Sequence, residues 1–436
     1  MRRALILVLL LGGIQLILPL GSFGQGSQAL LTFGFLILAA YTVGEIAGAM
    51  RIPKIVGYLL AGVIFGPSVL NVVSQDGAER LTGVSNLAVG FIAFLAGAEL
   101  QWQEVRENGV KLLKIMATEV GLSFVLLTAA IYGMTTFFDV IPEPTIQRNL
   151  AFSLLFATIA VVHSPAVTMA LLTETQAKGP VARTTLGVVL LSDIVVVLLF
   201  TGMLWVARAL VPVAGATASV GMVVWEIAGA LLIGALIGFG VAAYLRFVGK
   251  ELMLFAVLVT FFGLELTRAL HVELLLTLLT AGFISENFSR DGERLRHAME
   301  RSAAPVFVVF FALSGAAIGL RQVAPLLPLM IPLALFRAGV LKVGVSIGSR
   351  WAGVSEVEQK YVWLGLVSQV GVAIGLTVIA AEAYPELGEQ LRSLALAFIA
   401  INQTIGPVLF RRALEKSGEL AKPGEVRVPE PALSTR

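Results

Sequence analysis

The chain contains no cysteine among its 436 residues, which excludes disulfide bonds and thiolate metal sites. Charge is also scarce: charged residues make up 14% of the chain, hydrophobic residues make up 57%, and the mean hydropathy is +0.91. This balance leaves too little polar surface for a soluble globule of this length. The formal net charge of +3 is too small to argue for nucleic acid as a partner. The sequence therefore predicts an all-α polytopic membrane protein in contact with the lipid bilayer.

Hydrophobic runs long enough to cross a bilayer recur along the chain. A helix needs about 20 apolar residues to span a hydrocarbon core ~30 Å thick. Fourteen such segments are predicted, near 4–20, 28–49, 55–71, 83–101, 110–138, 149–173, 182–208, 219–247, 251–270, 272–288, 303–320, 326–350, 360–383 and 390–412.

Lys and Arg test this count, because they concentrate in cytoplasmic loops. With both termini in the cytoplasm, the inner loops and ends hold 23 of the 31 basic residues and the outer loops hold 6. The remaining two, Arg337 and Lys342, lie in the interior of a span, away from the span ends that are counted with the loops. A multi-pass protein of the cell (inner) membrane with a cytoplasmic C-terminus is therefore expected.

The two ends of the chain are predicted to lie outside the main transmembrane domain, residues 25–414. Residues 1–24 have the basic start and apolar run of either an N-terminal helix or a cleaved signal sequence, and both interpretations stay open. Residues 415–436, with three prolines and mixed charge, are expected to form a disordered cytoplasmic tail.

Two short motifs recur with nearly the same offset. LLAGVI at 59–64 resembles LTAGFI at 279–284, 220 residues later, and FIAFLAGAEL at 91–100 resembles VVFFALSGAAIGL at 308–320, with Gly97 and Gly315 218 residues apart. The predicted topology runs the first pair in opposite directions, which indicates inverted repeats, an architecture of secondary transporters. Chance similarity between helices built from a few apolar residue types is the alternative.

One apolar segment, 149–173, carries His163, Ser164 and Pro165 at its centre. Polar groups are costly in hydrocarbon, and proline interrupts the hydrogen bonding of a helix. Either the helix kinks here, or it breaks and exposes free carbonyls and amides near the membrane centre. His163 is then either a proton relay or a side chain that satisfies a free backbone group.

The following segment, TLGVVLLSDIVVVLLF, carries Asp193 with only Ser192 polar beside it. An ionisable group at this depth predicts a functional site. A low-dielectric environment favours the neutral form of a carboxyl, so that protons exchange closer to neutral pH. A structural aspartate paired with Lys or Arg is the alternative.

An ordered set of motifs resembles the sodium/hydrogen exchanger fold of the monovalent cation:proton antiporter family 2, over about residues 28–414. The motifs are GYLLAGVIFGPSVL, FIAFLAGAEL, TIAVVHSPAVTMALLTE followed by GVVLLSDIVVVLLF, and PVFVVFFALSGAAIGL. The resemblance implies thirteen core helices, a dimerisation domain that makes a homodimer, and a mobile core domain. It also implies two discontinuous helices that cross beside the ion-binding aspartate, namely 149–173 and 360–383, the latter interrupted near Ser368, Gln369 and Gly371.

The chain departs from its apparent relatives at three places that bear on charge. Many relatives have Pro-Arg-Gly-Glu or a similar charged stretch in the second broken helix, whereas this chain has SQVGVAIGL. Electrogenic relatives carry two adjacent acids at the site, whereas here Ser192 precedes Asp193, so electroneutral exchange is expected. The basic residue expected in 326–350 is either Arg337 or Lys342, and the depth of Lys342 favours it. Glu119 or Glu226 is a candidate partner for Arg337.

The function predicted from these residues is exchange of Na⁺, K⁺ or Li⁺ for H⁺ by alternating access. The cation would bind the carboxylate of Asp193 with oxygens from Ser192, Ser164 and Thr158, because hard cations prefer oxygen ligands. Protonation of the same carboxylate would displace the ion. No catalytic residue, resident metal or cofactor is predicted. A sodium-coupled symporter or cation channel of related fold is the alternative. A membrane-embedded enzyme is disfavoured, because the longest internal loop, residues 289–301, is basic and amphipathic and is more simply a cytoplasmic surface helix.

Overall fold

The computed structural model describes residues 25–138, 140–212 and 220–420, together with Leu10, Gly12 and Ile14. Most of the predicted N-terminal helix or signal sequence therefore lies outside the described residues, as does the predicted tail from residue 421 onward.

The regular structure of the described residues is helical. In chain order the elements are α2 (Gln25–Ala49), α3 (Lys54–Phe65), α4 (Gln75–Arg80), α5 (Thr82–Glu99), α6 (Trp102–Phe137), α7 (Ile146–Val161), α8 (Pro165–Thr175), α9 (Pro180–Leu210), α10 (Val220–Phe247), α11 (Leu252–Leu270), α12 (Leu274–Asn287), α13 (Gly292–Ala316), α14 (Leu320–Val323), η1 (Ala324–Leu326), α15 (Leu327–Ala352), α16 (Glu356–Gly365), α17 (Gly371–Ala383) and α18 (Pro385–Lys416).

The composition of these helices matches a membrane environment. Among the described residues, ten helical segments are long and apolar enough to cross a bilayer, and α3, α12 and α17 are shorter apolar helices. Large apolar side chains lie on the outside, for example Phe137, Leu236 and Leu335, each more than 60% exposed. Such a surface is stable against lipid and is unusual in a soluble protein. The predicted all-α polytopic membrane class is confirmed.

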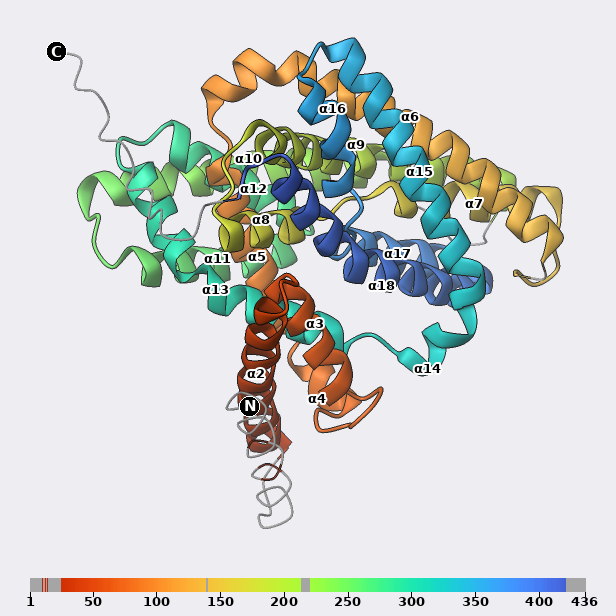
Figure 1. Ribbon diagram of the computed structural model, residues 1–436, viewed down its shortest axis with the longest axis horizontal. Coiled ribbons are helices and arrows are strands. Elements are labelled where there is room, and N and C mark those ends of the chain that lie inside the picture. Colours follow the sequence, from red (N-terminus) through yellow and green to blue (C-terminus); the bar gives the residue numbers. More distant parts are fainter. Residues whose placement is uncertain are drawn as a thin grey trace.

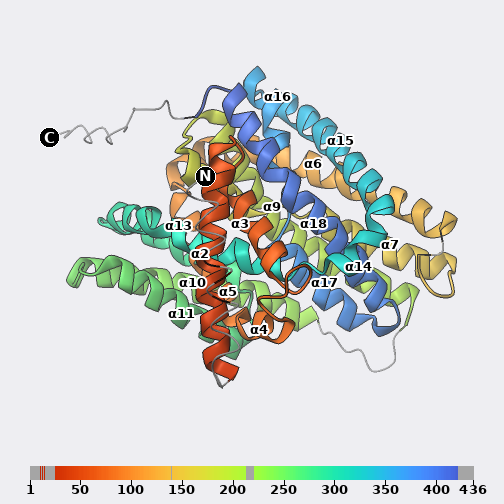
Figure 2. The same ribbon diagram turned by 60° about the horizontal axis from the view of Figure 1, so that its bottom comes forward.

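The helices pack as two groups (Figures 1 and 2). The panel group contains α2, α3, α5 and α10–α13, in which α5 packs on α12, α12 on α10, and α3 on α13. The core group contains α6–α9 and α15–α18, in which α6 packs along α15 and α7 against α9. Both views place α10 and α11 at one end of the molecule and α6 and α7 toward the other.

Two helix crossings in the panel group depend on glycine. A Cβ on Gly97 of α5 would lie 1.9 Å from the carbonyl oxygen of Leu279 on α12, and one on Gly282 would lie 2.0 Å from the oxygen of Phe94. The α3–α13 crossing has the same form at Gly62 and Gly315. Small residues let helix backbones approach closely where lipid supplies no hydrophobic driving force. The repeated motifs of the sequence therefore mark two close helix contacts.

The end of the chain folds back on α9. Helix α18 continues through Lys416, and the carboxylate of Glu419 accepts hydrogen bonds from the backbone N–H groups of Val181 (2.7 Å) and Ala182 (2.8 Å). These N–H groups lie in the first turn of α9 and have no acceptor within the helix. A negative charge there also interacts favourably with the positive end of the helix dipole. The described structure thus extends six residues past residue 414, the predicted end of the transmembrane domain.

The glycine contact predicts a difference between two alanine substitutions. Gly282→Ala should lower the free energy of unfolding by about 1–3 kcal/mol, because the new methyl group must displace the α5 backbone. Gly121→Ala on α6 is the matched control, since its Cβ would meet nothing within 4 Å. The measurement is the Tm of both purified variants in detergent. Equal Tm values would show that α5 and α12 do not need this close approach.

Candidate functional site

The segment that carries His163 and Ser164 is broken, not merely kinked. Helix α7 ends at Val161, and α8 begins at Pro165, so three residues between them lie outside helix. The hydroxyl oxygen of Ser164 accepts a hydrogen bond from the N–H of Val167 at 3.3 Å and caps α8. Serine at the N-cap and proline at the first helical position are favoured by their geometry, so the local sequence accounts for this new helix start.

A second break separates α16 from α17. Five residues, 366–370, connect the end of α16 at Gly365 to the start of α17 at Gly371. Ser368 and Gln369 in this connection are buried. A buried connection leaves backbone groups that need partners inside the protein, because neither water nor lipid can supply them.

The guanidinium of Arg337 on α15 supplies those partners. It is fully buried, and its Nε donates to the carbonyl oxygen of Ala160 at 2.6 Å. Its two Nη atoms donate to the carbonyl oxygens of Val367 (2.7 Å), Val162 (3.0 Å) and Leu366 (3.3 Å). These oxygens belong to the C-terminal ends of α7 and α16, which carry unsatisfied carbonyls and the negative end of the helix dipole. The guanidinium of Arg337 therefore joins both helix breaks.

Gln369 adds a second connection between the breaks. Its Nε2 lies within hydrogen-bond distance of the carbonyl oxygens of Ile159 (3.1 Å), Ala160 (2.9 Å) and Val162 (2.9 Å). Its own Oε1 accepts a hydrogen bond from Nδ2 of Asn402 on α18 at 3.1 Å. The start of α17 is thus held against the end of α7. Asn402 was not predicted, because an asparagine in an apolar helix carries no local sign of its partner.

His163 and Glu119 complete the network on the other side of Arg337. Nδ1 of His163 lies 2.7 Å from the carbonyl oxygen of Leu366, so this nitrogen carries a proton. Nε2 lies 3.0 Å from Oε2 of Glu119, whose Oε1 accepts from the hydroxyl of Ser123 at 3.0 Å. Of the two roles considered for His163, the contacts match a side chain that satisfies a free backbone carbonyl. Nδ1 of His163 also lies 3.4 Å from an Nη atom of Arg337, so the imidazole ring lies between Glu119 and Arg337.

The preference for Lys342 as the core basic residue is wrong. Lys342 is exposed on the surface of α15, whereas Arg337, five residues earlier, is 0% exposed. With 3.6 residues per turn, five residues rotate a side chain by about 140° around the helix axis. Depth along the helix was therefore the wrong criterion, because only the direction of Arg337 leads to the helix breaks.

Asp193 lies apart from this network, on α9. Its Oδ1 is buried and accepts no hydrogen bond from the described residues. It lines a cavity of about 30 Å³ with Glu273 and eight apolar residues: Leu190, Ile194, Val197, Ile227, Leu275, Leu276, Leu279 and Val372. This cavity lies where α9 and α17 of the core group meet α10 and α12 of the panel group. A buried acceptor without a partner is costly, so this oxygen is available to a cation or a proton.

The other predicted cation ligands are engaged elsewhere. The hydroxyl of Ser192 donates to the carbonyl oxygen of Val189 (2.8 Å), and that of Thr158 donates to Leu154 (2.8 Å), both within their own helices. Ser164 caps α8, as described above. None of the three is among the residues that line the cavity of Asp193. Glu273 does line this cavity, and it was not predicted. Its only signal in the sequence was an acid directly before the apolar run of α12.

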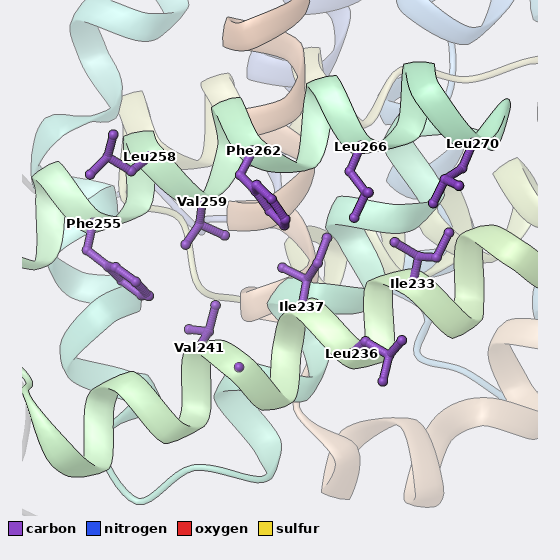
Figure 3. Close-up of a pocket in the computed structure, with 11 residues that line it drawn as sticks. Ile233, Leu236, Ile237, Val241, Phe255, Leu258, Val259, Phe262, Leu266 and Leu270 are labelled. Atoms are coloured by element: carbon purple, nitrogen blue, oxygen red, sulfur yellow. The ribbon is translucent and has the colours of Figure 1, made fainter.

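Two larger cavities differ sharply in character. A groove of about 690 Å³ runs between α10 and α11 and is lined by hydrocarbon side chains. Figure 3 shows Val259 and Leu266 of α11 pointing toward Val241 and Ile237 of α10 across it. It offers no ligand to a cation. A second cavity, of about 330 Å³, lies between α5, α8, α9 and α13 and carries charged side chains, namely Glu99, Lys178, Arg183, Arg296 and Glu300. It meets α9 at Leu186 and Gly187, about two turns from Asp193.

Comparison with known proteins places this geometry in context. The family described as "Sodium/hydrogen exchanger, transmembrane" matches residues 33–416. The chain is similar to the Na(+)/H(+) antiporter NhaS5 of Synechocystis (24% identity; 88% of this chain, 54% of that protein) and spans only about half the length of that relative. It is also similar to the ammonium/H(+) antiporter subunit AmhT of Alkalihalophilus pseudofirmus (24% identity; 88% of this chain, 93% of that protein). Among solved structures it resembles the sodium proton antiporter MjNhaP1 of Methanocaldococcus jannaschii, with a TM-score of 0.67 and 16% identity over 89% of this chain and 96% of that one.

The role of Arg337 predicts a large difference between two substitutions on the same helix. Arg337→Met should lower the free energy of unfolding by about 3–5 kcal/mol, because it leaves buried carbonyls at both breaks without donors. Lys342→Met is the matched control and should leave stability unchanged, since that side chain is exposed. The measurement is the Tm and the monodisperse yield in detergent. A wild-type Tm for Arg337→Met would refute the role assigned to this guanidinium.

Proposed function

The chain belongs to the sodium/hydrogen exchanger family, and from this premise we propose that it exchanges a monovalent cation, Na⁺, K⁺ or Li⁺, for H⁺ across the membrane. The family match bears out the resemblance seen in the sequence. The observation that carries the proposal is the buried, unpartnered carboxylate oxygen of Asp193 in a small cavity between two helix groups.

Competition for Asp193 is the proposed coupling step. A partly dehydrated cation or a proton neutralises the carboxylate, and neither can bind while the other does. The unoccupied, negatively charged carboxylate is costly to move through a low-dielectric region. Asp193 therefore crosses with a proton or a cation bound, and it does not cross empty. The 30 Å³ cavity suits a bare ion or one water molecule. It is too small for an organic anion, which disfavours the symporter alternative.

The movement proposed is that of the core group against the panel group. The hydrogen bonds of Arg337, Gln369 and Asn402 join α7, α15, α17 and α18 into a unit that can move as one body. The close glycine contacts of α5 with α12 and of α3 with α13 do the same for the panel group. Asp193 lies on the boundary between them, where a relative movement changes the side from which its cavity is reached. The charged cavity that meets α9 at Leu186 is the proposed route from one side.

The finer architecture proposed is an inverted repeat with thirteen spans, in which α7–α8 and α16–α17 are two discontinuous helices that cross. Three observations support it. The repeated glycines pair α3 with α13 and α5 with α12, which are exchanged by the repeat. Glu119 and Arg337, on α6 and α15, are 218 residues apart, the same offset as Gly97 and Gly315. Both breaks bring helix ends to the same guanidinium.

The remaining assignments follow the same premise. We place the chain in the cell (inner) membrane with α18 ending in the cytoplasm, from the distribution of Lys and Arg. A homodimer is proposed from the family resemblance. The transmembrane domain assigned is residues 25–414, with residues 1–24 as an N-terminal helix or signal sequence and residues 415–436 as a cytoplasmic tail.

The role of Asp193 is tested by one isosteric substitution. Asp193→Asn should abolish cation-dependent proton movement in proteoliposomes, because a carboxamide neither takes up a proton nor neutralises a cation. Stability should not fall, since the oxygen that is changed has no partner to lose. The Tm in detergent and a dye-based proton flux assay measure the two properties. Exchange by the reconstituted variant at a rate near wild type would show that Asp193 is not the carrier.

Ser192 in place of a second acid predicts electroneutral exchange. If one carboxylate holds either one proton or one monovalent cation, no net charge crosses the membrane in a cycle. Exchange should then proceed at the same rate with the membrane potential clamped at zero or at about −100 mV, where each net charge moved is worth ~2.3 kcal/mol. A rate that follows the imposed potential would rule out one-for-one exchange.

A further inference from the structure

The cavity of Asp193 contains a second carboxylate whose function is not explained by a single-acid exchanger. Asp193 and Glu273 are its two acidic lining residues, and the other eight are apolar. Asp193 belongs to the core group and Glu273 to the panel group, so the two carboxylates face the same space from opposite sides of the boundary. The negative charge of Glu273 acts electrostatically on Asp193. A cation in this space therefore meets two anions and little else.

Glu273 is held in place by the helix that follows it. It is the N-cap of α12, and its Oε2 accepts a hydrogen bond from the N–H of Leu276. Its own N–H points to the carbonyl oxygen of Glu226 on α10 at 3.4 Å. A carboxylate at a helix N-terminus is stabilised in its charged form by the free N–H groups and the helix dipole. The side chain of Glu273 is thus held in place at the start of α12, on the boundary between the two helix groups.

The charges around Glu273 leave that anion without a basic partner nearby. Glu226 on α10 is the other acid whose charge acts on it. On α11, Glu265 and Arg268 pair with each other at 3.0 Å on an exposed surface. The acid on α9 that faces Glu273 is Asp193. No Lys or Arg is among the residues that line the cavity.

The two carboxylates also differ in their place along the route through the protein. The charged cavity meets α9 between Ala182 and Gly187, before Asp193 in the chain. The small cavity meets α9 further along the helix, between Leu190 and Val197. Glu273 lines this small cavity. The charged cavity thus approaches Asp193 along the first turns of α9, whereas Glu273 lies at the start of α12.

We infer that Glu273 is a second cation-binding carboxylate, which coordinates the transported monovalent cation together with Asp193 when the site opens toward the start of α12. This inference rests on the proposed exchange function. In its ionised form the carboxylate of Glu273 adds attraction for the cation beyond that of Asp193. Its effect is one-sided: it tightens cation binding from one membrane face and leaves the other unchanged.

The test is Glu273→Gln, which keeps an oxygen to cap α12 and removes only the charge. Glu226→Gln is the matched control, because Glu226 is a neighbouring acid that does not line the cavity. Both are made with Gln101→Cys, a position that lines the charged cavity in a chain otherwise free of cysteine. A bulky, impermeant thiol reagent added outside the proteoliposomes then inactivates the molecules whose charged cavity faces the external solution.

With the reagent present, Glu273→Gln should raise the half-saturating Na⁺ or K⁺ concentration about tenfold, the effect of losing one nearby charge. The activity that the reagent removes is obtained by subtracting the flux with reagent from the flux without it. The half-saturating cation concentration of that activity should keep its wild-type value. Glu226→Gln should change neither. An unchanged value for Glu273→Gln, or an equal rise on both faces, would overturn the inference. Absence of cation–proton exchange in the parent Gln101→Cys protein and in the wild type would instead refute the proposed function.

Discussion

The structure depends on one buried basic side chain, that of Arg337. Two helices that stop inside a membrane protein leave several carbonyl groups which neither lipid nor water can satisfy, and the guanidinium of Arg337 donates to four of them. Burying an arginine is expensive unless its donors are used and its charge is balanced. Here the balance comes from two helix C-termini and, through His163, from Glu119. The breaks and the arginine therefore stabilise each other, and neither would be tolerated alone.

This arrangement explains why Asp193 remains free. The one fully buried basic side chain near the centre of the core group is committed to backbone carbonyls, so it does not form an ion pair with the aspartate on α9. The alternative of a structural aspartate paired with Lys or Arg thus finds no support among the described residues. A carboxylate without a permanent partner can take either a proton or a cation, which is the property that an exchanger requires.

Cavity size is a poor guide to function in this protein. The groove of about 690 Å³ between α10 and α11 is lined by hydrocarbon side chains, which suit lipid or another apolar surface. The cavity proposed for ion binding is more than twenty times smaller, as about 30 Å³ compares with about 690 Å³. A bare monovalent ion needs few oxygens close together, so chemistry at the lining outweighs volume.

Much of the fold could be predicted from local sequence, and the partners of its polar residues could not. Hydropathy marks helices because each residue's transfer energy is its own property, and Ser164-Pro165 marks a helix start because capping is local. Asp193 was recognisable for the same reason: a charge among apolar neighbours is conspicuous wherever it points. The choice between Arg337 and Lys342 depended on direction around the helix, and the roles of Glu273 and Asn402 depended on which distant helices pack beside them. Such contacts join residues far apart in the chain, so only the tertiary structure decides them.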